Sequence, residues 1–238
     1  MVLRIGMMTP SSNTVLEPLT SRLVAAIPGA SVHFARFRVT AIGLDAETLG
    51  QFDDRPMLEA AELLADAKVD VISWNGTSAG WLGLDADRRL CARITAATGI
   101  PASTSVLGLF EAMRRRGDRR LGLVTPYTPD VQAAIVANFA REGIDIVAER
   151  HLGIRDNFSF AEVDAATIGG MIDAVALERP DAISILCTNL AGLGLVAEFE
   201  ARHGIAIHDS IATAVAGALR TIGRPTASLA EFGQVFVE

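Results

Sequence analysis

The sequence contains an internal repeat, and this constrains the fold more than any other feature. Residues 4–10, RIGMMTP, recur as residues 120–126, RLGLVTP. Residues 70–78 align with residues 181–189, and residues 99–105 align with residues 204–210. The offset falls from 116 to 111 to 105 (120 − 4, 181 − 70, 204 − 99), as expected of two copies with loops of different length. We therefore expect two similar halves related by a pseudo-twofold axis.

In each half, short runs rich in Val and Ile alternate with amphipathic stretches, which predicts an α/β fold with a parallel sheet flanked by helices. The predicted strands are residues 3–8, 31–38, 69–74 and 101–104 in the first half, and 120–124, 145–150, 182–186 and 205–208 in the second. The final helix, about 211–222, is expected to return to the first half. The predicted lobes are therefore residues 1–112 plus 212–238, and residues 113–211.

Composition limits the partners. Half of the residues are apolar, and the net charge of −7 argues against nucleic acid or an anionic membrane while leaving room for a small anionic ligand. Neither a signal peptide nor an apolar stretch long enough to span a bilayer is evident. The two cysteines do not form a disulfide framework, so we expect a cytoplasmic protein. A homo-oligomer is compatible with this composition.

Several kinds of cofactor chemistry are not expected. Lys68 is the single lysine and precedes a predicted strand, where an exposed role is more typical than a Schiff base. The four histidines show no spacing typical of metal ligands, so no metal site is predicted. The sequence also lacks the glycine-rich turns that bind dinucleotides or ATP.

Small polar residues follow the predicted strands. Because ligands bind beyond the carboxyl ends of parallel strands, these turns are expected to face one another across a cleft between the halves. They are residues 9–13, 75–78, 125–128, 151–157 and 187–189.

The turns that follow equivalent strands of the two halves carry different residues at matching positions, Gly76 in the first half and Cys187 in the second. A site between the halves would therefore carry a thiol on one wall only. We expect a helix to begin near Thr188 or Asn189, and a helix amino terminus lowers the pKa of a thiol. Cys187 is thus the candidate reactive cysteine, although a buried structural cysteine is the commoner fate of this residue type. Cys91, inside a predicted helix, is expected to fill the core.

Hydroxyl groups in these turns suit an oxyanion site. Tyr127 is the single tyrosine, and its phenol can donate to a carboxylate or simply pack. Thr77 and Ser78 offer hydroxyls and main-chain donors, or serve as helix caps.

Two asparagines and two tryptophans have local explanations as well. Asn13 and Asn157 precede helices, where Asn is often a cap. Thr14, three residues before Glu17, has the spacing of a capping box. Trp74 is expected to face the core, whereas Trp81 either lines the cleft or covers it.

Taken together, these motifs resemble the aspartate/glutamate racemase superfamily, in the branch of maleate cis-trans isomerase and arylmalonate decarboxylase. The motifs are residues 10–14 with Glu17, residues 76–78, Pro126 with Tyr127, residues 153–157 and residues 187–189. The resemblance implies two Rossmann-like lobes, no cofactor, and a dicarboxylate bound in the cleft between them.

Within this superfamily, two pairs of residues point to different branches. Racemases and maleate isomerases carry a cysteine in both turns, whereas Gly76 with Cys187 is the arrangement of arylmalonate decarboxylases. Asn13 and Asn157 instead resemble asparagines that hold the substrate carboxylates in maleate isomerases. The resemblance alone does not choose between the branches.

Decarboxylation requires only one catalytic thiol, because a single proton must be delivered to one face of an enediolate. We therefore expect a cofactor-independent decarboxylase of a substituted malonate or related small dicarboxylate, with a glycine at position 76 leaving room for a departing carboxylate or side group. The alternatives are a maleate isomerase or an Asp/Glu-type racemase, and a non-catalytic dicarboxylate-binding protein. The catalytic candidates are Cys187, Tyr127, Thr77 and Ser78, and the substrate-binding candidates are Asn13, Pro10, Gly76, Thr188 and Asn157.

Overall fold

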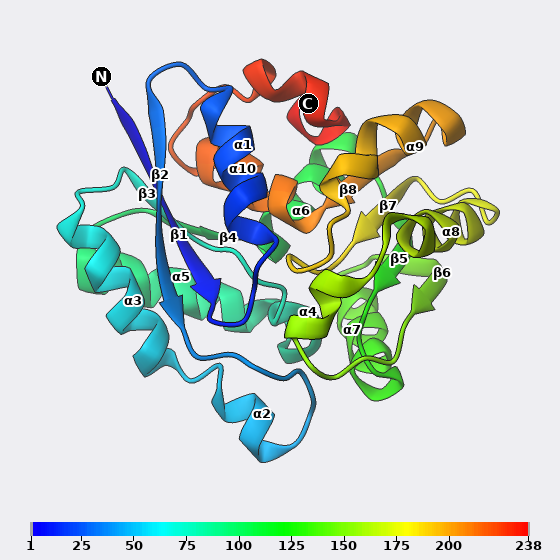
Figure 1. Cartoon of the computed structure of the whole chain (residues 1–238), viewed down its shortest axis with the longest axis horizontal. Helices are drawn as coiled ribbons and strands as arrows, with labels where there is room; N and C mark the ends of the chain where they lie inside the picture. The colour runs from blue at the N-terminus through cyan, green and yellow to red at the C-terminus, as the bar shows by residue number, and fades with distance from the viewer. Residues whose placement is uncertain (1, 238) are drawn as a thin grey trace.

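The computed structural model describes residues 2–237 and contains two four-stranded parallel sheets, with strand orders β2-β1-β3-β4 and β6-β5-β7-β8. In Figure 1 the first sheet, from blue β1 to green β4, lies on the left, and the second, from green β5 to orange β8, lies on the right. The strands of the first sheet are β1 Leu3–Pro10, β2 Ala30–Phe37, β3 Val71–Trp74 and β4 Ala102–Thr104. Those of the second are β5 Arg120–Thr125, β6 Asp145–His151, β7 Ala182–Ile185 and β8 Ala206–Asp209. The identical strand order confirms the predicted α/β fold of two related lobes.

Helices connect the strands and cover the sheets. The α-helices are α1 Leu16–Ala25, α2 Ala46–Gly50, α3 Asp54–Asp66, α4 Ala79–Leu82, α5 Leu84–Thr98, α6 Ser105–Arg116, α7 Pro129–Arg141, α8 Ala165–Ala176, α9 Val196–His203 and α10 Ser210–Thr221. Short 3₁₀ helices are η1 Phe158–Glu162, η2 Leu193–Leu195, η3 Ala227–Phe232 and η4 Gln234–Phe236. Within residues 2–237, no helix combines the length and the apolar character that crossing a bilayer requires.

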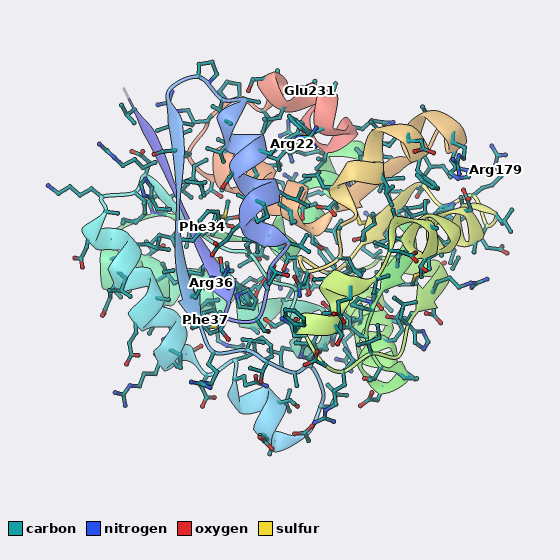
Figure 2. The ribbon with its side chains drawn as sticks, viewed as in Figure 1. Arg22, Phe34, Arg36, Phe37, Arg179 and Glu231 are labelled. Atoms are coloured by element: carbon teal, nitrogen blue, oxygen red, sulfur yellow. The ribbon has the colours of Figure 1, made fainter. Side chains whose placement is uncertain are left out.

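The repeat extends to individual hydrogen bonds. Asp70 accepts the backbone N–H of Arg4 at 2.7 Å, and the equivalent Asp181 accepts that of Arg120 at 2.8 Å. Each aspartate thereby holds the start of a central strand. Within residues 2–237, the residues with positive φ other than glycine are Lys68 (φ 52°) and Arg179 (φ 48°), which are also 111 positions apart (179 − 68). Arg179 marks the turn before β7 in Figure 2.

Helices α6 and α10 follow equivalent strands and pack on each other where the halves meet. A Cβ on Gly108 would lie 2.2 Å from the carbonyl oxygen of Thr213, and one on Gly217 would lie 3.1 Å from the Cα of Gly108. The two backbones are therefore almost in contact, which only glycine permits. Helix α10 also packs against α1, β3 and β4 of the first half. The exact residue boundaries of the two lobes remain a prediction.

Candidate active site

A small cavity lies at the carboxyl ends of the strands and is lined by both halves. The lining residues are Pro10, Val39, Ile42, Phe52, Trp74, Gly76, Thr77, Ser78, Trp81, Tyr127, Asn157, Cys187 and Thr188. All of the candidate residues named from the sequence are among them except Asn13. The parallel topology brings them together, because the carboxyl ends of β1, β3, β5 and β7 open toward the same space.

The cavity is nearly closed, with an open volume of about 20 Å³, which is room for about one water molecule. Larger cavities of about 470 and 490 Å³ lie elsewhere on the molecule. Arginine and glutamate side chains line both, but neither contains any of the candidate groups. The candidate side chains are therefore grouped around the small cavity.

Cys187 follows β7 and is only 2 % exposed. No helix begins at Thr188 or Asn189, so the sequence prediction there is wrong. The chain forms a turn over residues 188–190, and the next helix is the 3₁₀ helix η2 at Leu193–Leu195, followed by α9 from Val196. Burial raises the pKa of the Cys187 thiol to about 12, although the backbone N–H of Asn189 (3.4 Å from Sγ) and the Tyr127 hydroxyl act to lower it. Near neutral pH this thiol is protonated.

The hydroxyls of Thr77 and Tyr127 form a pair across the two halves, with 2.6 Å between Oγ1 and Oη. Burial raises the pKa of Tyr127 well above 10, and the neighbouring Cys187 adds to this. The phenol therefore remains a hydrogen-bond donor at all physiological pH values. Thr77, Tyr127 and Cys187 form one buried group of protonated side chains.

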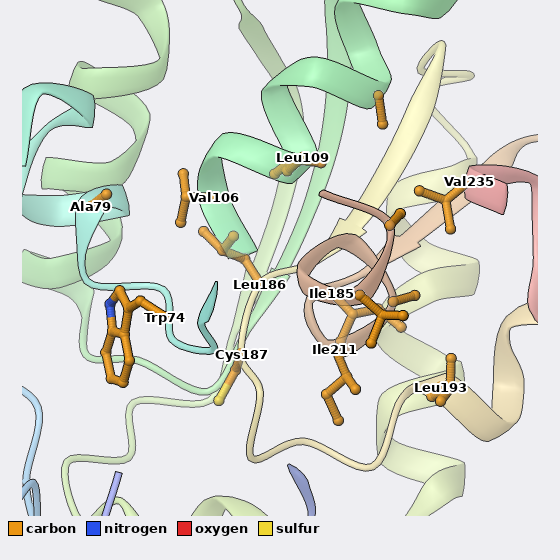
Figure 3. Packing of buried hydrophobic residues seen from close by; sticks show 14 of the residues in the cluster. Trp74, Ala79, Val106, Leu109, Ile185, Leu186, Cys187, Leu193, Ile211 and Val235 are labelled. Atoms are coloured by element: carbon orange, nitrogen blue, oxygen red, sulfur yellow. The ribbon is translucent and has the colours of Figure 1, made fainter. Parts of the chain in front are cut away.

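The space beside Gly76 is filled, which corrects the expectation that glycine leaves room there for part of the substrate. A Cβ on Gly76 would lie 2.1 Å from the indole ring of Trp74. Trp74 is buried, as expected, but its ring also forms a wall of the cavity. Its Nε1 donates to Ser78 Oγ at 3.2 Å, so the Ser78 hydroxyl proton is free to point elsewhere. Figure 3 shows the Trp74 indole and the Cys187 thiol as separate side chains of the buried cluster.

Trp81 lines the cavity and packs edge-on against Tyr127, with 5.3 Å between the ring centroids. It is 6 % exposed, and within the described part of the chain its Nε1 has no hydrogen-bond partner. A buried donor without a partner is costly, so a ligand oxygen would stabilise this N–H.

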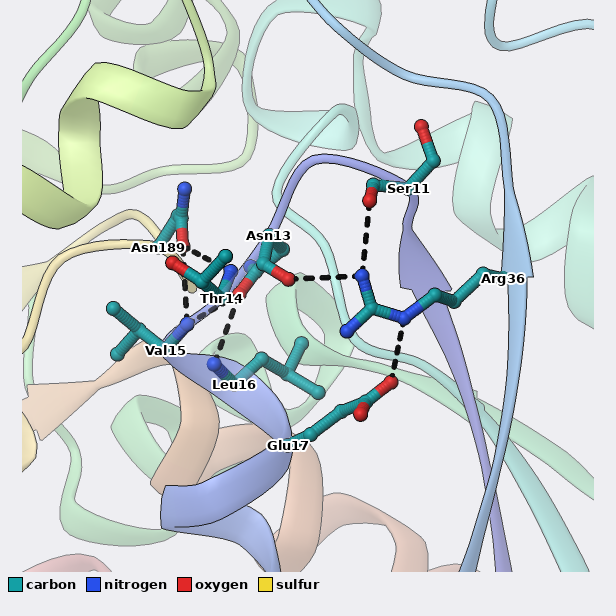
Figure 4. A network of polar contacts seen from close by, with 8 residues as sticks. All are labelled: Ser11, Asn13, Thr14, Val15, Leu16, Glu17, Arg36 and Asn189. Atoms are coloured by element: carbon teal, nitrogen blue, oxygen red, sulfur yellow. Dashed lines mark hydrogen bonds and ion pairs between the residues drawn. The ribbon is translucent and has the colours of Figure 1, made fainter.

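Asn13 lies beside the cavity rather than in its wall. Its Oδ1 accepts the backbone N–H groups of Val15 (3.0 Å) and Leu16 (2.9 Å), so Asn13 caps α1. The capping role expected for Thr14 is therefore wrong; Glu17 pairs with Arg36 instead (Figure 4). Asn13 reaches the cavity only through Thr188, whose Oγ1 accepts its Nδ2 at 3.2 Å.

Asn157 does line the cavity, and its Nδ2 donates to Ser12 Oγ at 2.7 Å. Its carbonyl oxygen accepts Nδ2 of Asn189, whose Oδ1 in turn accepts the N–H groups of Thr14 and Val15. These contacts join turns of both halves beside the cavity.

Free backbone donors surround the same space. Among residues 2–237, no partner is found for the N–H groups of Thr77, Ser78 and Thr188. With the hydroxyls they form a set of donors suited to an oxyanion.

The segment after β2, residues 39–52, also covers the cavity and was missed from the sequence. It supplies Val39, Ile42 and Phe52 to the wall. The segment is attached to the second half by the Ala41–Asp156 bridge and by the Arg155–Asp45 ion pair at 2.5 Å. In the sequence, the large apolar residues spaced along this otherwise polar connection could have indicated that it covers a buried site.

Cys91 lies on α5 and is only partly buried, so it is less of a core residue than expected. It does not line the cavity. This makes it a natural control for the reactivity of Cys187.

Comparison with known proteins agrees with this geometry. The family model described as arylmalonate decarboxylase matches residues 19–236. A maleate isomerase of Pseudomonas putida is 30 % identical over 213 residues, with 84 % of each chain covered. An arylmalonate decarboxylase of Bordetella bronchiseptica is 27 % identical over 237 residues, covering 98 % of this chain and 96 % of the relative.

Solved structures share the fold. A cysteine-to-serine variant of Nocardia farcinica maleate cis-trans isomerase, with a covalently bound succinylcysteine intermediate, superimposes with a TM-score of 0.91 at 23 % identity. The match covers 99 % of this chain and 98 % of that one. The named relatives are enzymes, and they divide between two activities. From the family match over residues 19–236, the chain belongs to the arylmalonate decarboxylase family.

Proposed function

We propose that the protein is a cofactor-independent decarboxylase of a small malonate-type dicarboxylate, with Cys187 as the proton donor. The observation that carries the proposal is the buried Cys187 thiol, whose pKa of about 12 keeps it protonated near neutral pH. A protonated thiol is an acid, whereas addition to a double bond requires the thiolate. Gly76 faces an indole, so no side chain of residue 76 supplies a second acid or base.

The reaction begins when the bond between the α-carbon and one carboxylate breaks and carbon dioxide leaves. Its electron pair passes to the remaining carboxylate, which becomes an enediolate. The donors of Thr77, Ser78 and Thr188 would stabilise this charge, and each well-placed donor contributes roughly 3 kcal/mol.

The Cys187 thiol then gives its proton to the α-carbon. The resulting thiolate is a strong base in this buried environment, and it regains a proton from water that enters as the product leaves. The Tyr127 hydroxyl is placed to stabilise the thiolate while it exists. In sum, a malonate dianion and water give a monocarboxylate and bicarbonate.

A second candidate is maleate cis-trans isomerisation, which the maleate isomerase relatives and the position of Asn157 in the cavity wall favour. In the Nocardia protein a cysteine carries a succinyl group. In this protein Cys187 would have to form the covalent bond to the substrate as a thiolate, but burial raises its pKa and favours the protonated thiol.

Proton NMR in deuterated buffer tests these proposals in one experiment, with malonate, methylmalonate, maleate and aspartate as substrates. Decarboxylation appears as a deuterated monocarboxylate, isomerisation as fumarate, and racemase chemistry as loss of the α-proton signal. We expect decarboxylation alone. Fumarate formation without loss of carbon dioxide would refute the proposal, and binding without turnover would favour a non-catalytic dicarboxylate-binding protein.

Cys187→Ala is expected to abolish turnover while leaving the fold and ligand affinity nearly unchanged, because the thiol transfers a proton and does not anchor the substrate. Cys91→Ala is the matched control and should retain full activity. Near-normal turnover by Cys187→Ala would remove this residue from the mechanism.

A further inference from the structure

The position of the Trp74 indole has a consequence for the substrate. The ring lies where a side chain of residue 76 would begin, 2.1 Å from an ideal Cβ at that position. This wall of the cavity is therefore the surface of an aromatic ring. A substituent on the α-carbon of a bound malonate that pointed toward Gly76 would collide with it.

Several contacts hold the indole in this place. Trp74 Nε1 donates to Ser78 Oγ, and Phe37 packs against the ring with 5.0 Å between centroids. Trp74 is 1 % exposed, and its backbone is in the middle of the sheet, in register with Met8 on one side and Thr104 on the other. Moving the ring would require breaking a buried hydrogen bond and repacking a core.

Another wall of the cavity, formed by residues 39–52, is held differently. Residues 39–52 form a connection whose ties to the second half include the Ala41–Asp156 bridge and the exposed Arg155–Asp45 pair. Segments with few buried contacts open at lower cost than core strands. The cavity must widen to admit any dicarboxylate, and this wall is the one that can yield.

We propose that Trp74 is a specificity-determining residue that limits the substrate to malonates whose α-carbon carries hydrogen or a small alkyl group, and that it excludes arylmalonates. This inference rests on the proposed function, because it assumes that a dicarboxylate binds between Cys187 and Gly76. It differs from the expectation, drawn from the glycine alone, that position 76 leaves room for a departing carboxylate or side group.

Binding to a Cys187→Ala background tests the proposal separately from the reaction. The dissociation constants of methylmalonate and phenylmalonate are measured by isothermal titration calorimetry on Cys187→Ala alone and combined with Trp74→Leu. We expect Cys187→Ala to prefer methylmalonate, and Trp74→Leu to shift the ratio toward phenylmalonate by at least about 100-fold, since even one methylene changes discrimination by 10-fold to 200-fold.

Two further variants control for unfolding and for a general loss of packing. Trp74→Phe keeps a ring and should shift the ratio in the same direction by less, so it serves if Trp74→Leu does not fold. Phe139→Leu truncates a buried aromatic that packs against Phe110, outside the cavity, and should leave the ratio unchanged.

These measurements distinguish the role of Trp74 from the existence of the dicarboxylate site. Equal binding of both ligands to Cys187→Ala, or an unchanged ratio in folded Trp74→Leu and Trp74→Phe, would overturn the role of Trp74 while the dicarboxylate site stands. A shift as large in Phe139→Leu would overturn it as well. If methylmalonate, phenylmalonate, malonate and maleate all fail to bind to every variant, the dicarboxylate site itself is refuted. The proposed limit on the size of the α-substituent is then refuted as well.

Discussion

The ionisation of Cys187 decides between a proton donor and a nucleophile, and it can be measured directly. With a pKa of about 12, compared with 9.0 for an ordinary thiol, only about 1 in 10⁴ molecules carries a thiolate at pH 8 instead of about 1 in 10. A more basic thiolate is also more nucleophilic, which offsets roughly 20-fold of this thousandfold difference in reactions with disulfides. Ionisation alone should therefore slow the reaction about 50-fold, and burial should slow it further.

The assay follows 5,5′-dithiobis(2-nitrobenzoic acid) at 412 nm with the Cys91→Ser variant, so that Cys187 is the thiol observed. The same variant unfolded in guanidinium chloride gives the reference rate. Between pH 7 and pH 10 the native rate should rise about tenfold per pH unit without a plateau, because the thiolate fraction is still far from saturation. A plateau with a midpoint near pH 7 would show a thiolate in the resting site, refute the proton-donor reasoning and support the isomerase alternative.

Three other variants test the rest of the site. Tyr127→Phe and Thr77→Val should each lower kcat by about 100-fold with little change in KM, and their effects should not add because the two hydroxyls are hydrogen-bonded to each other; a change confined to KM would make them ground-state binders. Gly76→Ala should destabilise the fold by about 1–3 kcal/mol in thermal or denaturant unfolding, because the new methyl overlaps the Trp74 indole; an unchanged stability would show that the ring yields freely. His208 is buried without a hydrogen-bond partner within residues 2–237, and burial lowers its pKa to about 3, so the unfolded chain takes up a proton below pH 6.5 while the folded one does not. Relative to His208→Leu, the protein should therefore lose up to about 1.4 kcal/mol of unfolding free energy per pH unit as the pH falls from 6.5 toward 4, measured by urea unfolding; parallel pH profiles would refute this.

Much of the fold could be predicted because the repeat and the Val/Ile runs are local signals. Every predicted strand occurs within two residues of its expected ends; residues 182–186, for example, correspond to β7 Ala182–Ile185. The turns that follow the strands were expected to meet, since parallel topology leaves them no other edge of the sheet.

What could not be predicted depends on partners far away in the sequence. A helix was expected after Cys187, but Asn189 instead contacts Asn157 and the N–H groups at the start of α1, which holds the chain in a turn. In the same way, Phe37 and Ser78 determine where the Trp74 indole lies. The first error reversed the direction of the thiol pKa, and the second filled space that had been assigned to the substrate.

The near contact of α6 with α10 has a consequence for motion. Ser105 Oγ donates to the carbonyl of Ser210 at 2.5 Å, and Thr213 Oγ1 donates to that of Ser105 at 2.9 Å, beside the glycine crossing. A movement of α6 relative to α10 would drive backbone into backbone at this crossing, because the two glycines leave no side chain there to absorb the shift. We therefore expect the two sheets to move as one rigid body. The rate of substrate exchange should then depend on local opening of residues 39–52 and not on the hinge-bending common among two-lobed binding proteins.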